Sequence, residues 1–486
     1  MTVDDTALTA LRAAAAGEVL LPADPGFGQA RADAIWNGNI GHRPAAIVRP
    51  TSNEQVAAAL AAARSAGLPI TVRGGGHGVA GKAVADGALM IDLSRFAGVR
   101  VDRDARRAHV GGGAAWAALD AATAEHGLAV TGGTISHTGV AGLTLGGGLG
   151  WLMPRAGLSC DNLLGATLVT ADGRTVEVSE QTHPDLLWGL RGAGTNFGVV
   201  TELVLGLHEA TPMVNLGLFF WPAAEAGAPL AFARDHLYDL DPQLGALIAG
   251  ISAPPEPFVP AELHGAPGFA VIVVGWGEGT EHAAAVAPLR ARRPAFELVT
   301  PIPYVALQQM LDATSPWGVH AYDKSLNLDD LPDAAIEILA DRLPRKRSPL
   351  SLIPLFPLRG RVREISDDAT AYGPSRSRRW TVSFEGVAMD EEGLVGERQW
   401  SRDLWTALRP YATDDGAYAN LDSDADAARV QVTFGEEKYR RLAALKATWD
   451  PEHVFGSGAE IGAGPAAAGI PAPRGSAEAA TPEPAG

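Results

Sequence analysis

The segment from Ile70 to Gly81 places the strongest constraint on what this chain can fold into. Ile70-Thr71-Val72 is typical of a short strand, because all three side chains are β-branched. The segment then carries five glycines around a single histidine, His77. Because glycine has no side chain, several backbone N–H groups can turn toward one anion. The segment therefore predicts a phosphate-binding loop with His77 in its middle.

Two nucleotide-binding motifs nearly match this loop. Residues 76–81 have the glycine spacing of a dinucleotide-binding fingerprint, and residues 76–82 fit a P-loop up to its last position. Both motifs need a helix directly after the loop, but residues 83–93 predict a turn and a strand. Ala83 also stands where a P-loop needs a hydroxyl. The context disfavours both motifs, and a glycine-rich turn with a solvated histidine stays open.

A second glycine-rich segment runs from Thr131 to Gly150. Its glycines are interleaved with apolar residues and followed by Trp151, whereas a flexible linker would be polar. This composition predicts backbone packed tightly against other backbone or against a flat ligand.

Composition excludes several classes of function. At 486 residues the chain is long for one core, so two domains are expected. The net charge of −17 argues against nucleic acid and anionic membranes as partners. Cys160 is the single cysteine, which excludes an intrachain disulfide and a thiolate zinc cluster, and we expect no metal site.

We expect neither a secretory signal at the N-terminus nor a membrane span. Asp4 and Asp5 replace the basic cluster of a secretory signal, and no window reaches the ~18 unbroken apolar residues of a membrane span. We therefore expect a cytoplasmic protein without a membrane partner, either a monomer or a homodimer. Residues 463–486 predict a disordered tail, because they are almost entirely small, proline or acidic residues.

The rest of the chain alternates between helix and strand patterns. Ser52-Asn53-Glu54-Gln55 is a capping box that opens a helix predicted over 56–66. Asp172-Gly173 predicts a hairpin between two strands. Beyond Thr211 the pattern predicts a sheet with helices on one face. Its strand candidates are 216–221, 270–275, 350–355 and 380–384, its helix candidates are 223–238, 281–292, 332–343 and 393–409, and a last helix is predicted over 436–448.

Four motifs in order resemble a known family. They are Arg73-Gly74-Gly75-Gly76-His77, the glycine run 139–150, residues 157–162 and Asn196-Phe197-Gly198-Val199-Val200-Thr201. Together they resemble the vanillyl-alcohol-oxidase (PCMH-type) flavoproteins, specifically the branch that resembles berberine bridge enzyme. The resemblance runs from about Trp36 to Leu207, and it resumes from Tyr439 to Phe455.

The resemblance implies an α+β fold. It consists of a PCMH-type FAD-binding domain of two α+β subdomains, plus an inserted α+β substrate domain with an antiparallel sheet. The implied boundaries are an N-terminal extension at 1–35, the first part of the FAD-binding domain at 36–210, the substrate domain at 211–432, the C-terminal return at 433–462 and the tail at 463–486.

The same resemblance implies that FAD lies along both glycine segments. The loop from Arg73 to Gly78 would hold the pyrophosphate, and the second segment with Gly198-Val199 would lie along the rest of the cofactor. The implied FAD-binding residues are Arg73, Gly74, Gly75, Gly76, His77, Gly78, Gly132, Gly133, Thr134, His137, Thr138, Gly139, Gly142, Gly146, Gly198, Val199 and Val200.

His77 matches the histidine that this family bonds to the 8α-methyl group of the isoalloxazine ring. Such a bond is expected to raise the flavin potential. Many relatives add a second bond from a cysteine, but Ile135 stands at that position, and Cys160 lies too far along the chain to replace it. We expect a single link, as in the mono-histidyl members, 6-hydroxynicotine oxidase and the enterocin-type favorskiiase.

The implied activity is that of an FAD-linked oxidoreductase. An oxidase would transfer hydride from a small-molecule alcohol or amine to FAD, which dioxygen then reoxidises. A flavin dehydrogenase, a flavin-dependent oxygenase of secondary metabolism and a non-catalytic flavin-binding protein stay open as alternatives.

The sequence indicates the catalytic residues less clearly. Relatives often carry Tyr-x-Asn-Tyr where this chain has Tyr418-Ala419-Asn420-Leu421, so the second tyrosine is missing. Tyr418, Tyr372 and His137 are the candidate catalytic residues, and Tyr322 and Lys324 are further candidates. Each also has an ordinary interpretation, since a half-buried tyrosine usually anchors a hydrogen bond and a lysine usually extends to solvent.

Arg359, Arg361 and Arg363 alternate after the strand predicted over 350–355. If that strand continues, the three guanidinium groups share one face. Facing the flavin they would favour an anionic substrate, and facing solvent they would protect an edge strand. Glu460 stands where relatives often carry an asparagine near the flavin.

Overall fold

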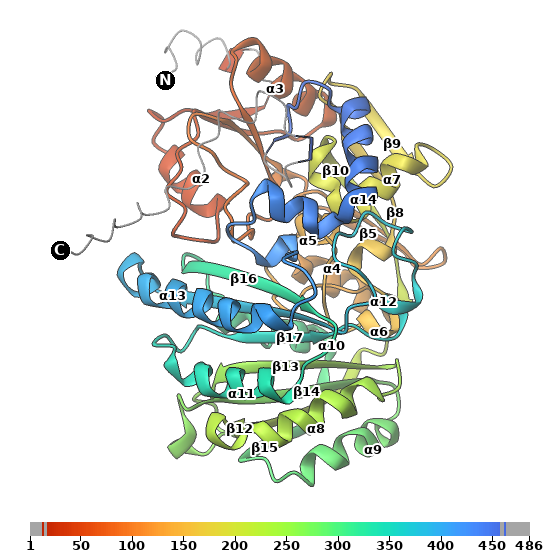
Figure 1. The fold of residues 1–486 in the computed structure, drawn as a ribbon. Helices are drawn as coiled ribbons and strands as arrows, with labels where there is room; N and C mark the ends of the chain where they lie inside the picture. Colours follow the sequence, from red (N-terminus) through yellow and green to blue (C-terminus); the bar gives the residue numbers. More distant parts are fainter. Residues whose placement is uncertain (1–11, 14–16, 457–460, 463–486) are drawn as a thin grey trace, which may run out of the picture.

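The computed structural model describes residues 12–13, 17–456 and 461–462, which contain three larger sheets (Figure 1). Two of them lie in the upper part of Figure 1, and the third lies below them. The predicted tail at 463–486 and Glu460 fall outside the described residues. Within them, no helix combines the length and apolar character that a membrane crossing requires.

The first sheet contains the strand that leads into the glycine loop. Its order is β1 (Glu18–Leu20), β2 (Ala46–Arg49), β4 (Leu89–Asp92) and β3 (Ile70–Arg73), with β1 antiparallel to β2 and the other pairs parallel. A parallel pair needs a long crossover, and helix α3 (Asn53–Ser65) provides it. Ser52 Oγ accepts the N–H of Gln55 at 3.4 Å, so the predicted cap is confirmed.

The chain passes from β3 through the glycine loop into β4 without an intervening helix. This agrees with the sequence-based argument against a dinucleotide-binding fingerprint and a P-loop. Helix α2 (Phe27–Ala34) packs against the same sheet through Phe27 and Ala30, beside Ile47 and Met90. Residues of the predicted N-terminal extension therefore pack with the first sheet, and the domain boundaries stay a prediction.

The second sheet is antiparallel and carries the other glycine segment. Its order is β5 (Val99–Asp102), β6 (Arg107–Gly111), β10 (Val199–Gly206), β8 (Leu163–Val169) and β9 (Thr175–Ser179). The turn between β8 and β9 contains Gly173 at φ +82°, as the predicted hairpin requires. Helices α4 (Trp116–Ala124), α5 (Val140–Leu145) and α7 (Pro184–Ala193) contribute residues to its core.

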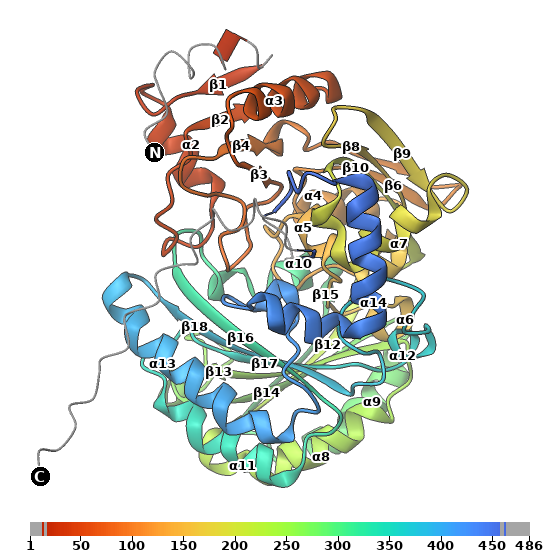
Figure 2. The same cartoon turned by 45° about the horizontal axis from the view of Figure 1, so that its top comes forward.

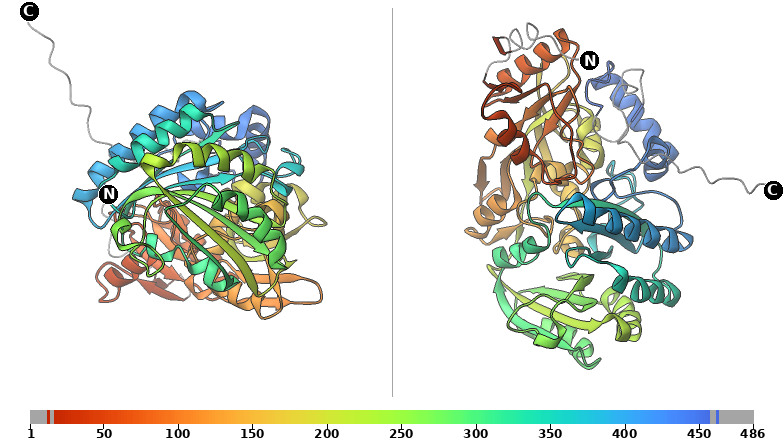
Figure 3. Two further views of the ribbon diagram at one scale, coloured as in Figure 1. Left: turned by 90° about the horizontal axis from the view of Figure 1, so that it is seen from below. Right: turned by 90° about the vertical axis from the view of Figure 1, so that its left-hand side faces the viewer.

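The third sheet has seven antiparallel strands with helices across one face (Figure 2). Its order is β15 (Phe296–Pro303), β12 (Met213–Pro222), β14 (Pro267–Trp276), β13 (Leu244–Ser252), β17 (Ile353–Pro357), β18 (Trp380–Ala388) and β16 (His320–Leu328). Seen from below in Figure 3, the helices cross the strands. They are α8 (Gly227–Tyr238), α9 (Gly279–Arg290), α11 (Asp333–Arg342) and α13 (Glu391–Leu408). The predicted α+β layer with helices on one face is confirmed.

The opposite face of this sheet packs toward the rest of the molecule. Phe220, Ile272 and Phe356 lie in one apolar core with Trp151 and Leu158. A buried ion pair adds to this contact, because Arg376 Nη1 donates to Asp161 Oδ2 at 3.0 Å. Asp161, which belongs to the motif at 157–162, therefore joins the second part of the chain to the first.

The last helix, α14 (Ala427–Trp449), returns to the first half of the chain and lies beside α7 (Figure 1). It begins earlier than predicted and bends at Gly435, which has φ +71°. Lys446 Nζ donates to Asn196 O at 2.7 Å, to Phe455 O at 2.8 Å and to Asp450 Oδ2 at 2.6 Å. This buried ammonium fixes the end of α14 and Phe455 to the loop before β10.

The arginine prediction was wrong. Strand β17 ends at Pro357, Gly360 turns the chain at φ +57°, and α12 (Arg361–Glu364) follows. Arg359 is buried and donates to the carbonyl oxygens of Leu240 and Leu244. The three arginines therefore share no strand face, and β17 is an interior strand that needs no protection by charge.

Candidate functional site

A cavity of about 430 Å³ lies between the glycine segments and the third sheet. Its walls come from the loop after β3, the segment around α5 and the turn before β10. Its floor comes from β13, β16, β17 and β18, on the face away from the helices. Residues 417–425 close one side.

His77 is the most distinctive side chain in the wall. Its ring stacks on Trp36 with centroids 4.5 Å apart, and the ring of His137 lies 4.9 Å away on a tilted plane. His77 Nε2 is buried and has no hydrogen-bond partner. Burial, with a smaller contribution from His137, lowers the pKa of His77 to about 3. The imidazole is therefore neutral and keeps a nitrogen lone pair.

The two glycine segments meet backbone to backbone. A Cβ atom on Gly75 would lie 2.3 Å from Gly139 Cα, and one on Gly76, at φ +73°, would lie 2.0 Å from Ala34 O. Gly78 and Gly142 also line the cavity, but a Cβ atom there would meet nothing within 4 Å. Protein packing alone does not require glycine at those two positions. Their bare backbone therefore fits a ligand that lies flat against it.

The predicted FAD-binding residues fall into two groups. Those that line the cavity are Gly74, Gly75, Gly76, His77, Gly78, Gly133, Thr134, Thr138, Gly139, Gly142, Gly146, Gly198 and Val200. Arg73, Gly132, His137 and Val199 do not line it. Arg73 Nη1 contacts Asp92 Oδ1 at 3.3 Å, so the arginine supports the loop from its protein side.

The predicted catalytic tyrosines differ in their access to the cavity. Tyr418 lines it, and its Oη accepts the N–H of Gly148 at 2.8 Å and Asn420 Nδ2–H at 3.0 Å. Tyr372 lies behind it, with its ring 6.2 Å from that of Tyr418 and its hydroxyl buried without a partner. Burial raises the pKa of both phenols, so both are neutral near pH 7.

Tyr322 and Lys324, the further candidates, are engaged outside the cavity. Tyr322 Oη donates to Asp424 Oδ2 at 2.6 Å, and Lys324 Nζ contacts the other oxygen of the same carboxylate. The ammonium also lies 4.9 Å from the ring centroid of Trp405 on α13. These contacts favour a structural role for both side chains.

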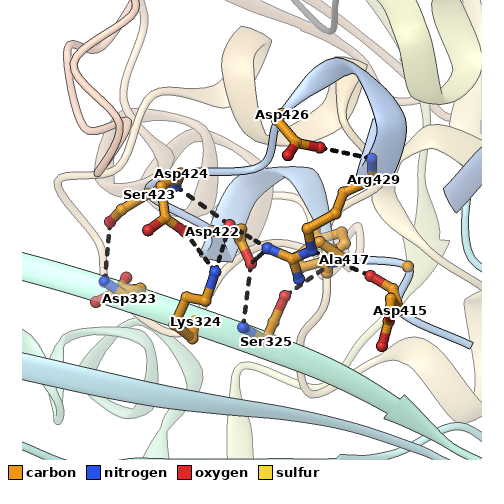
Figure 4. Close-up of polar contacts among 12 residues, drawn as sticks. Asp323, Lys324, Ser325, Asp415, Ala417, Asp422, Ser423, Asp424, Asp426 and Arg429 are labelled. Atoms are coloured by element: carbon orange, nitrogen blue, oxygen red, sulfur yellow. Dashed lines mark hydrogen bonds and ion pairs between the residues drawn. The ribbon is translucent and has the colours of Figure 1, made fainter. Parts of the chain in front are cut away.

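Residues 417–424 run along the free edge of β16 (Figure 4). Ser423 Oγ accepts the N–H of Asp323 at 2.9 Å, and Asp422 Oδ2 accepts the N–H of Ser325 at 3.4 Å. Ser325 Oγ accepts the N–H of Tyr418 at 2.9 Å. The edge strand of the third sheet therefore positions Tyr418 at the cavity.

Two carboxyl groups in the cavity floor were missed by the sequence reasoning. Asp323 on β16 lies directly opposite Glu385 on β18, and both side chains line the cavity. Asp323 Oδ1 has no hydrogen-bond partner. Burial, then Glu385 and Asp422, raises the pKa of Asp323, and burial raises the pKa of Glu385. The sequence offered little signal, because Asp323 lies beside Lys324 and Ser325 in a mixed strand and only Glu385 is the single ionisable residue of its strand.

Comparison with known proteins identifies the family. A model described as "FAD binding domain" matches residues 44–179, and one described as "Berberine and berberine like" matches residues 417–461. The chain is 30% identical to an FAD-linked oxidoreductase of Dictyostelium discoideum over 88% of this chain and 90% of the relative. It is 32% identical to (R)-6-hydroxynicotine oxidase of Paenarthrobacter nicotinovorans over 90% of this chain and 95% of that relative. The chain belongs to the berberine-bridge-like family of FAD-linked oxidoreductases.

Solved structures show the same fold for this berberine-bridge-like chain. The crystal structure of 6-hydroxy-D-nicotine oxidase from Arthrobacter nicotinovorans aligns with a TM-score of 0.81 at 28% identity, over 92% of this chain and 98% of that one. A glucooligosaccharide oxidase of Acremonium strictum aligns with a TM-score of 0.80 at 24% identity, over 95% and 99%. The predicted PCMH-type α+β fold is confirmed.

Membership of the berberine-bridge-like family also confirms the cofactor and the class of enzyme. The protein is an FAD-dependent oxidoreductase, and its relatives favour an oxidase over the dehydrogenase, oxygenase and non-catalytic alternatives. The residues present fit FAD, because the open backbone at Gly78 and Gly142 offers a flat surface beside the unpartnered His77 Nε2.

Proposed function

We propose that this oxidase holds FAD through one covalent bond, from His77, and oxidises a small-molecule alcohol or amine. The neutral imidazole of His77 supports the bond, because a nitrogen needs a free lone pair to bond to carbon. Ile135 lines the cavity at the position where many relatives carry a second attachment, and Cys160 is buried in an apolar core away from it. Both observations support a single link.

When bound beside His77, FAD would supply the capacity to take up a hydride from the substrate and to be reoxidised by dioxygen. The chain supplies binding, orientation and exclusion of water. We assign the direct catalytic contact to Tyr418, since its oxygen accepts two N–H donors and its own O–H can point to a substrate oxygen or nitrogen. Tyr372 supports that ring from behind, and His137 supports the ring of His77.

The contacts of α14 support the proposed division into domains. Leu442 and Leu445 on this helix share one apolar core with Leu186 and Leu190 on α7. We therefore assign residues 36–210 and 433–462 to one FAD-binding domain, and 211–432 to a substrate domain. The cytoplasmic location and the monomeric or homodimeric state stay predictions, which fractionation and light scattering test.

Mass spectrometry of the denatured protein tests the covalent bond. Wild type should retain the mass of FAD, and His77→Ala should release it. His126→Ala provides a control, because His126 is exposed at the end of α4 and does not line the cavity. Retention of FAD by denatured His77→Ala would disprove attachment at His77.

An anaerobic screen tests the oxidase assignment. Alcohols, sugars, amines and phenols are mixed with the yellow protein, and a substrate should bleach its visible absorbance. Readmitted oxygen should restore the colour and release one peroxide per product. Bleaching that only an artificial electron acceptor reverses would instead indicate a dehydrogenase.

A further inference from the structure

The floor of the cavity combines an apolar surface with one acidic pair. Its apolar residues are Leu247, Ala249 and Ile251 on β13, Leu352, Pro354 and Phe356 at β17, and Val387 on β18. Among the described residues of these strands that line the cavity, the ionisable ones are Asp323 and Glu385. A substrate body that lies on this floor therefore meets hydrocarbon almost everywhere and carboxyl groups at one point.

The geometry of the pair makes it a strong electrostatic feature. Directly opposed residues on antiparallel strands have Cβ atoms about 5 Å apart, so the two carboxyl groups interact strongly. Asp323 lines the cavity and is only 5% exposed, and its buried Oδ1 atom has no hydrogen-bond partner. Two buried carboxylates this close cannot both be charged without a compensating cation.

Within the part of the chain that the structure describes, this pair has no partner cation. No described residue forms an ion pair with Asp323 or Glu385. Asp422, the neighbouring carboxylate, is already satisfied because Arg429 Nη1 donates to both of its oxygens at 3.0 Å. Lys324 Nζ contacts Asp424, outside the cavity. Among the described floor residues, Asp323 and Glu385 are thus the carboxyl groups that remain available to pair with a cationic ligand.

We propose that Asp323 and Glu385 bind the ammonium group of an amine substrate whose remaining surface is largely apolar. This inference rests on the proposed function and narrows its substrate class from alcohols or amines to apolar amines. An ammonium group donates hydrogen bonds to both carboxyl groups and compensates their charge. A sugar fits this floor less well, because its many hydroxyl groups would face hydrocarbon without partners. An anionic substrate would find no cationic partner among the described residues of this floor.

Calorimetric titration of the FAD-loaded protein without oxygen tests the proposal. The probes are N-methylbenzylamine, its neutral isostere benzyl methyl ether, and cellobiose, all at a pH where the amine is protonated. Wild type should bind the amine at least about tenfold more tightly than the ether, as hydrogen bonds between charged groups allow. Asp323→Asn and Glu385→Gln keep the side-chain shape and should each remove this preference while changing ether binding less than about twofold.

Glu337→Gln provides the matched control, because Glu337 is exposed on α11 and its loss changes the net charge equally. This variant should bind all three probes as wild type does. Equal binding of amine and ether by wild type, a preference that survives in both variants, or tighter binding of cellobiose would each overturn the proposal. If Asp323→Asn does not fold, the preference of Glu385→Gln for the amine over the ether tests the proposal by itself.

The proposed function fails in a different way. Its failure would appear as missing flavin or as absent peroxide formation, whatever the probes bind. A yellow protein that forms peroxide from some alcohol, and that binds amine and ether equally, would overturn the amine inference alone.

Discussion

Gly75 and Gly139 lie so close that neither has space for a side chain: a Cβ atom on Gly139 would lie 2.5 Å from Gly75 Cα. This contact holds the two glycine segments together beneath the cavity. Glycine is therefore required at these two positions by protein packing, whereas other glycines of the cavity leave space for FAD.

Substitutions at Gly139 and Gly142 should therefore fail in opposite ways. Gly139→Ala should destabilise the apoprotein by about 1–3 kcal/mol, because the opposing backbone must move. Gly142→Leu should leave apoprotein stability close to wild type and lower the FAD content, because the side chain enters open space in the cavity. Thermal unfolding of apoprotein and visible flavin absorbance give the two readouts. Normal FAD content in Gly142→Leu would place the cofactor elsewhere.

A cysteine at position 135 should create a second point of attachment. Ile135 lines the cavity beside Gly133 and Thr134, where many relatives carry their cysteine. Ile135→Cys combined with His77→Ala should keep FAD after denaturation, whereas His77→Ala alone should lose it. Mass spectrometry distinguishes the two, and loss of FAD from the double variant would show that Ile135 does not face the ring.

The buried ammonium of Lys446 should be a major source of stability. Lys446→Met should cost about 3–5 kcal/mol, because it leaves the Asp450 carboxylate buried without its cation. Arg440→Ala on the same helix should cost at most about 1 kcal/mol, since its pair with Glu436 is exposed. Denaturant unfolding of both variants measures the difference. Equal costs would mean that the Lys446 contacts contribute little.

The acidic pair should also make stability depend on pH. Burial raises the pKa of Asp323 and Glu385 in the folded protein, so the folded state holds more protons than the unfolded chain above pH ~4. The contribution of each group to stability must then fall as pH rises from about 4 toward its folded pKa, by at most about 1.4 kcal/mol per pH unit. The melting temperature of the Asp323→Asn apoprotein should therefore rise relative to that of the wild-type apoprotein as the pH increases from 4 to 8. A constant difference would contradict the raised pKa values.

Much of the fold follows from local sequence signals. The capping box at Ser52, the hairpin at Gly173 and the loop after Val72 were predictable, because each depends on residues adjacent in the chain. The strand predicted over 350–355 does not continue through Arg359, because Gly360 adopts φ +57° and turns the chain. Alternating arginines look the same in a strand and in a turn that leads to a helix.

The cavity floor could not be predicted in the same way. Asp323 and Glu385 face each other only because β16 pairs with β18, and the sequence between them contains α11 and β17. His77 could be found because a glycine loop surrounds it, whereas each acidic residue lies in a strand of ordinary composition. Pairing of distant strands is a tertiary property that one sequence does not display.

The segment at 417–424 has a consequence for redesign of this enzyme. It covers the edge of β16 and also carries Tyr418, which lines the cavity. Hydrogen bonds between this segment and β16 therefore connect the tyrosine to the substrate floor. A new floor grafted from a relative would displace that phenol unless residues 417–424 were transferred with β16. A redesign that changes substrate specificity should therefore exchange β16 and residues 417–424 together.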